Sequence, residues 1–487
     1  MADIGKLFKQ CTSAEILGKV LASKLQRYLK SPFSAYCDLY APKPEQDPPS
    51  PFQELLKGRG IEWERRYVER NYPDLAEIAF TDDLDGFRKT LEAMDKGAAA
   101  LHDMPLFWQD LQGRFDIAEK RTTHGSVFGR HHYIIKEIKS ARNIKDHHII
   151  QAAMYNCMLG KIQGYTPLYF FMINADGKEQ KESFKEWEKP LMRAIEDVRL
   201  LIDGRLKPTP TYGQGEFPWK GYSNRKAVEL KDISLVAGVK EATKRKLAEA
   251  GIATIKGLVD AKLPALKELG IKDKDAEKMR LSARAILTGK TIVEKIPELP
   301  KAKTDVYMDF ESTDEPMEAD LERIDYLIGM LVCQGKRREY RPFIAHTPDD
   351  EGRMFKEFLK FTQGLKDFVL YHWHVYERTR MKHLMDKYKV KAPLREHVFD
   401  HMVDLHKVAT SAITFPTYGN GLKEIAKWLG FSWRHGEVTA QESIALYLKY
   451  AEDNKRHADS LRLILDYNED DCIATLKVKE YLEGLEG

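Results

Sequence analysis

Side chains suited to metal-assisted phosphodiester cleavage occur in the first third of the chain. Asp116 ends the strand-like run 111–116, and Glu137 and Lys139 alternate along a second run, 133–139. Side chains two residues apart on a strand share a face, so Glu137 and Lys139 are predicted to point the same way. Pairing of the two runs would bring Asp116 beside them. Two carboxylates can then hold Mg2+, and the ammonium group supplies a cation near the attacked phosphate.

A second acidic pattern lies in the last third of the chain. Asp309 and Glu311 alternate at the end of another strand-like run. Glu377 follows in the segment His-Trp-His-Val-Tyr-Glu, and Tyr467 precedes Asp471 by four residues near the carboxyl end. Each of these patterns taken alone is common on protein surfaces. Only their order and spacing along the chain support a functional site.

The elements that must position these residues fall into three blocks. The first mixes helix and strand, with helices predicted over 14–29, 51–72 and 147–159, the last amphipathic, and strands over 111–116, 132–138 and 167–173. The second block, 226–292, is predicted to be wholly helical. A third block begins near 303, with strands predicted over 305–310, 326–332, 339–345 and 368–371 and helices thereafter. Proline and glycine mark the boundaries at 206–218 and 297–301.

Composition sets the general class of protein. The chain has 487 residues, 43% hydrophobic and 31% charged, which predicts a globular protein of several domains. No apolar run approaches the roughly 20 residues of a membrane span, and no signal peptide is evident, so we expect a cytoplasmic protein without a membrane partner. The five cysteines form no CxxC pair, which excludes a disulfide framework or a zinc site.

The first block resembles the RecB-like branch of the PD-(D/E)xK nucleases over roughly residues 15–175. The motifs are Gly-x3-Glu, Gly-x2-Asp, Glu-x-Lys and Gln-x3-Tyr, in that order. The resemblance implies a restriction-endonuclease-like fold in which Glu64, Asp116 and Glu137 are metal ligands. It also implies that Lys139 orients or activates the attacking water. Substrate would lie along the following two residues: Gln151 and Tyr155.

One feature of that family is missing. Many RecB-like exonucleases pair an early cysteine with three later ones to hold an iron–sulfur cluster. Cys37 has no such partners between Lys161 and Pro218. We therefore predict no iron–sulfur cluster, and Mg2+ or Mn2+ as the cofactor.

The middle block resembles a helix-hairpin-helix module. From Lys226 to Lys290 there are fifteen Lys and Arg against nine Asp and Glu. In that family, hairpin N–H groups and a helix N-terminus hold a DNA phosphate without reading sequence. The resemblance implies DNA contacts from four residues: Gly238, Lys240, Lys244 and Lys246. The alternative is a helical spacer whose lysines are simply solvated.

The third block resembles the DEDD-type exonucleases with the RNase H-like fold. The resemblance implies that Asp309, Glu311, Glu377 and Asp471 hold two divalent ions and that Tyr467 orients the nucleophilic water. Asp404 is a further candidate for support of the site. The sequence departs from the family pattern at two positions: His372 stands where Asn is usual, and Glu377 replaces Asp.

Taken together, these patterns predict a multi-domain α/β chain. The predicted domains are a PD-(D/E)xK domain (1–205), a linker (206–225), an all-α helix-hairpin-helix domain (226–292) and an RNase H-like exonuclease domain (300–487). The predicted function is a divalent-metal-dependent nuclease acting on DNA, at single strands or duplex ends, in repair or defence, with RNA as an alternative substrate. Two rival hypotheses stay open: a one-site nuclease whose carboxyl-terminal domain only clamps the strand, and a non-catalytic adaptor that recruits a helicase.

Overall fold

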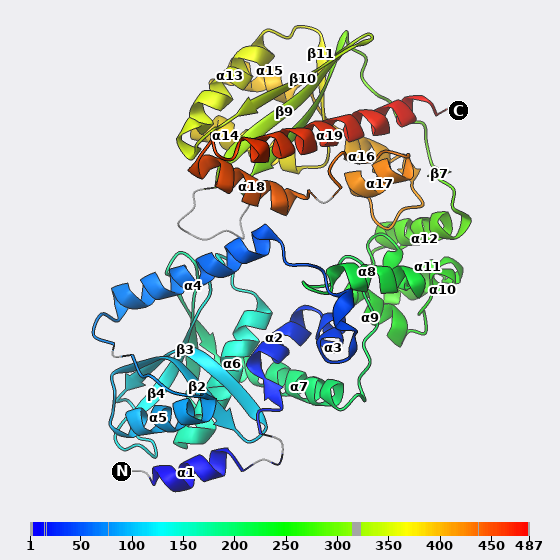
Figure 1. The fold of residues 1–487 in the computed structure, drawn as a ribbon. Helices are drawn as coiled ribbons and strands as arrows, with labels where there is room; N and C mark the ends of the chain where they lie inside the picture. The colour runs from blue at the N-terminus through cyan, green and yellow to red at the C-terminus, as the bar shows by residue number, and fades with distance from the viewer. Residues whose placement is uncertain are drawn as a thin grey trace. The chain divides into compact units, whose positions relative to one another are not determined.

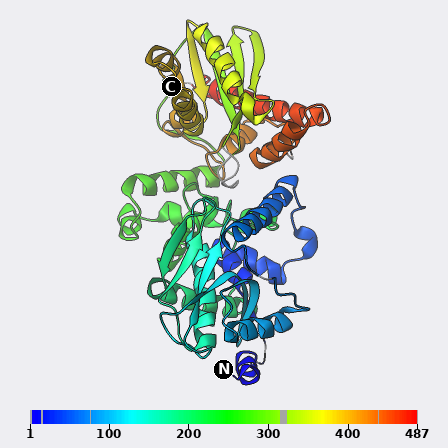
Figure 2. The ribbon, with the colours of Figure 1, turned by 90° about the vertical axis from the view of Figure 1, so that its left-hand side faces the viewer.

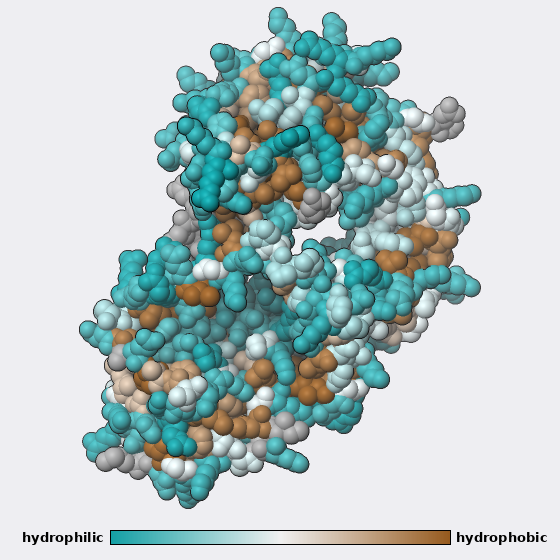
Figure 3. Space-filling view, in the orientation of Figure 1, coloured by the Kyte–Doolittle hydropathy of each residue, from teal (hydrophilic) through white to brown (hydrophobic). Residues whose placement is uncertain are grey.

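The computed structural model describes residues 3–13, 15, 17–75, 77–313, 323–436 and 438–485. The chain forms two compact units, with the main division after Asn224 (Figure 1). Each unit mixes helices and strands. Hydrophilic residues predominate on the face shown in Figure 3, where hydrophobic residues form separate patches. Among the helices described, none combines the length and apolarity needed to cross a membrane.

The first unit is built on a six-stranded sheet in which β3 and β4 lie at the centre. The order is β1-β3-β4-β5-β6, and β2 also pairs with β3. The β3–β4 and β2–β3 pairs are antiparallel, whereas β4 and β5 are parallel. The strands are β1 (Val20–Leu21), β2 (Ala100–Trp108), β3 (Leu111–Arg121), β4 (His132–Ile138), β5 (Tyr169–Ile173) and β6 (Glu179–Ser183).

Helices cover this sheet and hold its core. The largest buried cluster joins α6 and α7 to Phe115 and Ile135 of the strands. A smaller cluster joins Trp63 and Val68 of α4 to the central strands. The helices of this unit are α1 (Ile4–Cys11), α2 (Ala22–Lys30), α3 (Pro32–Tyr40), α4 (Pro51–Asn71), α5 (Asp83–Asp95), α6 (Asp146–Gln163), α7 (Phe184–Ile202) and α8 (Lys220–Glu229), with a short 3-10 turn η1 (Lys43–Glu45).

The second unit begins with a helical module and continues into a second sheet. The module comprises η2 (Ile233–Leu235), α9 (Glu241–Glu249), α10 (Ile255–Asp260), α11 (Leu263–Glu268) and α12 (Asp273–Thr288). The sheet order is β10-β9-β8-β11-β12, antiparallel on the β10–β9–β8 side and parallel on the β8–β11–β12 side. A separate two-stranded sheet joins β7 to β13.

The bounds of these later elements follow. The strands are β7 (Ile292–Val293), β8 (Thr304–Ser312), β9 (Asp325–Gln334), β10 (Arg337–Ile344), β11 (Phe368–His372), β12 (Met402–Asp404) and β13 (Ile413–Thr414). The helices are η3 (Pro348–Asp350), α13 (Glu351–Gln363), α14 (Tyr376–Lys387), α15 (Ala392–Phe399), α16 (Leu405–Thr410), α17 (Leu422–Trp428), α18 (Ala440–Glu452) and α19 (Ala458–Glu483).

Alternation along β8 decides which side chains meet which layer of helices. Val306, Met308 and Phe310 pack in the cluster with α13 and α14. The intervening residues face α19, which runs along the other side of the sheet (Figures 1 and 2). Asp309 and Glu311 therefore lie on the α19 face, because side chains on a strand alternate with a period of two.

Most predicted elements are confirmed, but two helices and several strands differ. The helix predicted over 14–29 begins only at Ala22, after the short strand β1; residues 14 and 16 lie outside the described part. The helix predicted over 147–159 is not amphipathic, since α6 is buried on nearly all sides between the sheet and neighbouring helices. Strand β2 was not predicted, because its buried residues do not alternate regularly, and strand β12 was not predicted, because three residues are too few to show a period.

A buried ion pair fixes α14 against the second sheet. Arg380 of α14 donates two hydrogen bonds of 2.6 Å to the carboxylate of Asp325, which begins β9. Both side chains are at most 3% exposed. Burial raises the pKa of Asp325 to about 6, although Arg380 opposes that rise. The pair sets the position of α14 and hence of Glu377 in its first turn.

We predict that Arg380→Ala destabilises the second unit by about 3–5 kcal/mol, because it leaves Asp325 as a buried, unpaired charge. Urea unfolding of the full chain, followed by circular dichroism, measures the change. The matched control is the double variant Arg380→Met/Asp325→Leu, which removes both charges and should recover most of the loss. A single variant as stable as the wild type would show that the pair does not hold α14.

Candidate functional site

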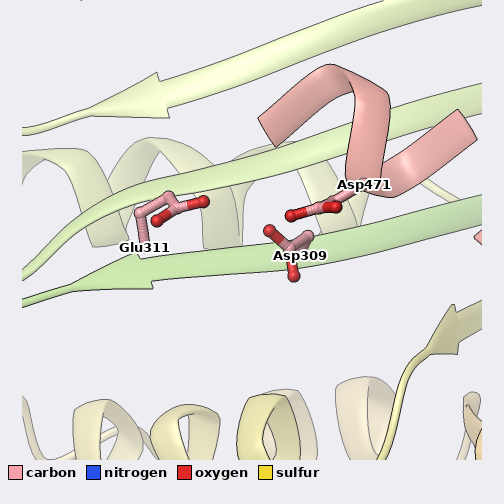
Figure 4. Close-up of side chains that lie close together, drawn as sticks. All are labelled: Asp309, Glu311 and Asp471. Carbon is pink, nitrogen blue, oxygen red and sulfur yellow. The ribbon is translucent and has the colours of Figure 1, made fainter. Parts of the chain in front are cut away.

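Three carboxylates of the second unit converge on one point. Asp309 and Glu311 come from β8 and Asp471 from α19, and their nearest oxygens all lie within 4.8 Å of one another. Figure 4 shows the three side chains turned toward a shared space between strand and helix. Asp309 and Asp471 are 162 positions apart in the chain (471 − 309), so tertiary packing brings the site together.

Burial and mutual repulsion disfavour ionisation of all three acids. Burial raises the pKa of Asp309 well above its ordinary value, and the charges of Asp471 and Glu311 raise it further. The pKa of Glu311 rises to about 8, chiefly through burial and then through Asp471. Burial also raises the pKa of Asp471 to about 6, with Lys423 opposing the rise. A cluster with such pKa values gains from any cation that enters it.

Neutral donors from α19 itself, from β9 and from the loop before α18 orient the carboxylates. Asn468 Nδ2 donates to Asp309 Oδ2 at 2.8 Å, and Trp433 Nε1 donates to Asp471 Oδ1 at 2.8 Å. The Tyr326 hydroxyl lies 3.4 Å from Glu311 Oε2. These contacts fix the side chains without neutralising their charge.

The amide of Asn468 is itself held in place. Tyr340 donates its hydroxyl hydrogen to Asn468 Oδ1 at 2.8 Å. Gly329, the residue of β9 opposite Asp309, leaves the space that this amide fills. A Cβ at Gly329 would overlap Asn468 Oδ1 and would lie 2.9 Å from the Tyr340 hydroxyl. Gly329 is therefore required here by close packing.

The loop that carries Trp433 is anchored to α19 by its neighbour Arg434. The Arg434 side chain bonds Asp470 Oδ1 at 2.9 Å, Glu469 Oε2 at 2.8 Å and Asp466 Oδ1 at 3.1 Å. A guanidinium group suits this role because its donors are fixed in one plane. The anchor positions Trp433 against Asp471.

Glu377 lies at the start of α14 and is 5% exposed. Its Oε2 atom is 3.5 Å from Nδ1 of His372, and neither atom makes a hydrogen bond. Burial raises the pKa of Glu377, while His372 opposes the rise. Glu377 also raises the pKa of Asp309, so the two carboxylates interact. A buried carboxylate oxygen without a donor fits a place for a cation.

Two further predicted residues have different surroundings. Asp404 ends β12 and caps α16, accepting the N–H of Lys407 at 3.0 Å. It also accepts the N–H of His374 at 3.1 Å, so it acts on the loop before Glu377. Tyr467 is 5% exposed and lies one helical turn before Asp471, whose pKa it helps to hold down.

Lys423 of α17 brings a positive charge to the same place. Its Nζ lies 4.6 Å from the ring centre of Tyr467 and 5.6 Å from that of Trp433. Its charge opposes the rise in the pKa of both Asp471 and Glu311. An ammonium group at the rim of an acidic cluster can contact an incoming phosphate.

In the first unit, Asp116, Glu137 and Lys139 lie side by side as the strand pairing predicts. Lys139 Nζ donates to Glu137 Oε1 at 2.8 Å. Asp116 Oδ2 accepts the N–H of Ile138 at 2.6 Å, and the N–H of Asp116 lies 3.5 Å from Glu137 Oε2. Glu137 is only 1% exposed.

The electrostatics of this trio differ from those of the carboxyl-terminal acids. Burial raises the pKa of Asp116 well above its usual value, and Glu137 adds to that rise. Burial also raises the pKa of Glu137, although Lys139 opposes it. Burial alone would lower the pKa of Lys139, but Glu137 and Asp116 raise it overall. Lys139 thus stays charged and partly balances its neighbours.

Glu64 lies near this trio, but its carboxylate contacts His102 instead. Its Oε1 lies 3.1 Å from Nε2 of His102, and its charge still raises the pKa of Asp116. Within the described ranges, Glu64, Asp116 and Glu137 do not bring their oxygens within 4.8 Å of one another as the carboxyl-terminal acids do. A change of the Glu64 rotamer would be needed for shared coordination.

The predicted groove residues of α6 line a cavity of about 210 Å³. Gln151 donates to the Tyr155 hydroxyl at 2.9 Å and accepts from Gln26 at 2.9 Å. Tyr155 packs so closely on Gly113 that a Cβ there would overlap its ring. This explains the glycine of the Gly-x2-Asp motif: it admits the tyrosine ring beside Asp116.

The four predicted DNA contacts of the helical module are placed unequally. Lys244 forms an ion pair with Asp232 at 2.7 Å and is only 13% exposed, so it fastens the hairpin. Lys240 is exposed at the N-cap of α9, and Lys246 lines a cavity. Gly238 has φ 89°, a conformation that favours glycine.

Sequence reasoning missed Asn468, Trp433 and Lys423. Asn468 stands inside the Tyr-x3-Asp motif, so its position in that motif could have suggested a role. Trp433 and Lys423 lie in segments with no motif of their own, and only the folded chain places them beside Asp471.

Comparison with known proteins bears on the second unit alone. Residues 306–483 match the model of the RNase_H superfamily. No curated protein matches the chain. The matched region contains every acid of the carboxyl-terminal cluster, together with Asn468, Trp433 and Lys423. The second unit therefore contains an RNase H-like domain, a nuclease-type fold.

Proposed function

We propose that this protein is a divalent-metal-dependent nuclease that hydrolyses DNA phosphodiester bonds, with exonucleolytic action on ends or single strands, in repair or defence. The observation that carries the proposal is the convergence of Asp309, Glu311 and Asp471 inside the RNase H-like domain. Members of this superfamily are generally hydrolytic nucleases, which supports hydrolysis of phosphodiester bonds. That the substrate is DNA is part of the proposal.

The residues present fit a divalent ion. Oxygen ligands are the donors that Mg2+ and Mn2+ prefer, and three carboxylates supply them from a rigid strand and helix. Burial raises the pKa of Asp309 and Glu311, so a cation that replaces their protons would stabilise the ionised carboxylates. The unpartnered oxygen of Glu377 makes it the fourth candidate ligand. A bound divalent ion would supply an activated water and charge neutralisation at the phosphate.

Protein groups then have distinct tasks around that ion. Asn468 and Trp433 keep Asp309 and Asp471 in fixed rotamers. Tyr467 orients the attacking water in this proposal, which is the role that the resemblance implies. Lys423, whose charge acts on Asp471 and Glu311, holds a non-bridging oxygen of the phosphate.

The first unit supports a second nuclease site of the PD-(D/E)xK kind. Its specific support is the contact of Lys139 with Glu137 beside Asp116. We propose that Asp116 and Glu137 hold one divalent ion, with Glu64 as a further ligand, and that Lys139 acts on the attacking water. Gln151 and Tyr155 would line the path of the strand. The rival hypotheses, a clamp without activity in the carboxyl-terminal domain and a helicase-recruiting adaptor, make different predictions in the digestion below.

We predict that variants distinguish the activities of the two proposed sites in a digestion of end-labelled DNA and RNA, single- and double-stranded, with Mg2+ or Mn2+. Asp309→Ala should lower carboxyl-terminal cleavage by at least about 100-fold, since a lost ligand removes several kcal/mol of transition-state stabilisation. Glu137→Ala should abolish the remaining activity.

The control for that digestion is Glu357→Gln, an exposed acid of α13 that forms an ion pair with Arg353 on the same helix. Unchanged cutting by Asp309→Ala, with weakened strand binding, would favour the clamp. Absence of cutting by the wild type on every substrate would favour the adaptor.

We predict that the metal-free protein loses stability as pH rises from about 4 to about 8. The folded state keeps protons on Asp471 to about pH 6 and on Glu311 to about pH 8, whereas the unfolded chain releases them near 3.8 and 4.5. The folded state thus binds more protons in this window, and stability falls with pH.

Thermal melts across this pH range measure the effect. Mn2+ should reverse the loss, since it stabilises the ionised acids. Asp309→Asn should flatten the pH dependence and shrink the Mn2+ effect, while Glu357→Gln should do neither. A wild-type melting temperature that is insensitive to Mn2+ at pH 8 would contradict metal binding.

We predict that Lys423→Met lowers kcat/KM for a labelled single strand by about 10- to 100-fold, the range for loss of one charged donor at a phosphate. The rise in melting temperature with Mn2+ should persist, because Lys423 is not a metal ligand. Lys427→Met, an exposed position on the same helix, is the control. Equal effects of both variants would exclude a specific role for Lys423.

A further inference from the structure

A cavity of about 510 Å³ lies in the first unit, between α4 and the turn that joins β5 to β6. None of the described residues that line it belongs to the two proposed nuclease sites. Cavities of about 300–1,000 Å³ commonly enclose small ligands, and the lining side chains determine which kind fits. The helical wall carries Trp63, Arg66, Tyr67 and Arg70, and the turn contributes Asp176 and Gly177.

Two aromatic side chains of α4 form one side of this cavity. Trp63 and Tyr67 lie about one helical turn apart, and their rings stack with centres 5.5 Å apart and planes 21° apart. Trp63 is held in the buried cluster with Ile117 and Ile138, whereas Tyr67 is only partly buried. Rings anchored in this way offer a planar surface on which a second flat ring can stack.

Two guanidinium groups flank the aromatic rings. Arg66 and Arg70 are four residues apart on α4, so their side chains lie on the same face of the helix. Both are exposed, and both line the cavity. Asp176, which lies 3.6 Å from Arg142 Nε, contributes a carboxylate to the lining, so the net charge is +1 (two minus one). Guanidinium donors lie in one plane and match the oxygens of a phosphate.

The opposite wall is a turn held by side-chain hydrogen bonds. Asn174 Oδ1 accepts the N–H of Asp176 at 3.0 Å, and Asn174 Nδ2 donates to the carbonyl of Arg142 at 3.0 Å. Gly177 follows with φ 71°, a conformation that favours glycine. A Cβ at Gly177 would lie 3.9 Å from Cε2 of Tyr67, so glycine leaves the space beside this ring open.

The other charges near Tyr67 are paired with one another. Lys136 Nζ lies 2.8 Å from Glu119 and 2.7 Å from Glu179. Burial raises the pKa of Tyr67, and the two carboxylates add to that rise while Lys136 opposes it. Tyr67 therefore stays neutral, and the two arginines supply the positive charge of the cavity.

We propose that this cavity binds a free nucleoside phosphate, with the base stacked on Tyr67, the phosphate between Arg66 and Arg70, and the sugar hydroxyls toward Asp176. Each chemical part of such a ligand matches a different side of the cavity. Inorganic phosphate would leave the aromatic rings uncovered, and a nucleoside would make no use of the arginines. Binding of a small ligand here is separate from strand hydrolysis and goes beyond the proposed nuclease function.

Isothermal titration calorimetry of the full chain in EDTA with adenosine 5′-monophosphate (AMP), adenosine and inorganic phosphate tests this site. AMP should bind at least about 10-fold more tightly than adenosine or phosphate, because a hydrogen bond to a charged group contributes about that factor. Arg70→Gln should weaken AMP binding at least about 10-fold and leave adenosine binding unchanged. Tyr67→Leu should weaken binding of both AMP and adenosine, by about 5- to 100-fold, the range for loss of one stacked base.

The matched control is Arg65→Gln, an exposed arginine of the same helix that pairs with Glu69 at 2.8 Å and does not line the cavity. It should bind AMP like the wild type, and Arg70→Gln should melt like the wild type because Arg70 is exposed. Absence of saturable AMP binding by the wild type, or equal weakening by Arg65→Gln, would overturn the proposal.

A labelled oligodeoxythymidine distinguishes a free nucleotide from a strand. If the oligonucleotide binds through Arg70 while AMP does not bind, the cavity belongs to a strand and the proposal is overturned. The titration with AMP involves no cleavage, so failure of the nuclease proposal would leave its result unchanged.

Discussion

The constraint on which the second unit depends is the burial of carboxylates that repel one another. The nearest oxygens of Asp309, Glu311 and Asp471 lie within 4.8 Å of one another, Asp309 half-buried and the other two buried, and burial raises the pKa of each. Burying unpaired charge is unfavourable, so the surrounding structure must hold the acids there. It does so with neutral donors, Asn468 and Trp433, which set geometry but leave the negative charge uncompensated. The repulsion among these acids lowers the stability of the fold, and a bound cation would relieve it.

The buried acids of the two units differ in how closely a positive charge lies beside them. In the first unit, the ammonium group of Lys139 lies 2.8 Å from Glu137 and supplies an internal counter-charge beside Asp116. In the second, Lys423 stands at the rim, over the ring of Tyr467, and only moderates the repulsion. Under the proposed function, the carboxyl-terminal acids should therefore gain more from a bound ion than the trio of the first unit. This difference gives a physical reason to expect unequal metal affinity at the two sites.

The helical module is joined to the RNase H-like domain by backbone contacts, and its lysines have different surroundings. Pairing of β7 with β13 ties it to the RNase H-like domain, and the ion pair of Lys244 with Asp232 stiffens its first hairpin. Lys244, one of the lysines predicted to bind DNA, is thus held in an ion pair, whereas Lys272 and Lys278, which no motif singled out, line a cavity of about 470 Å³. A basic surface read from composition says how much charge is present but not which lysines are free.

The sequence by itself determined the strands that carry the acids and which of their side chains share a face. The alternation of Asp309 and Glu311 on β8, and the approach of Asp116 to Glu137, follow from a period of two and from pairing of neighbouring runs. Only the tertiary structure decided the contacts between separate segments: Asp471 beside Asp309, 162 positions away, and Trp433 on Asp471, 38 positions away. It also decided that α6 is buried on nearly all sides, although its sequence suggested one exposed face. Local geometry is set by the backbone and is visible in short stretches of sequence. Contacts between distant segments depend on how whole layers pack, and no local pattern records them.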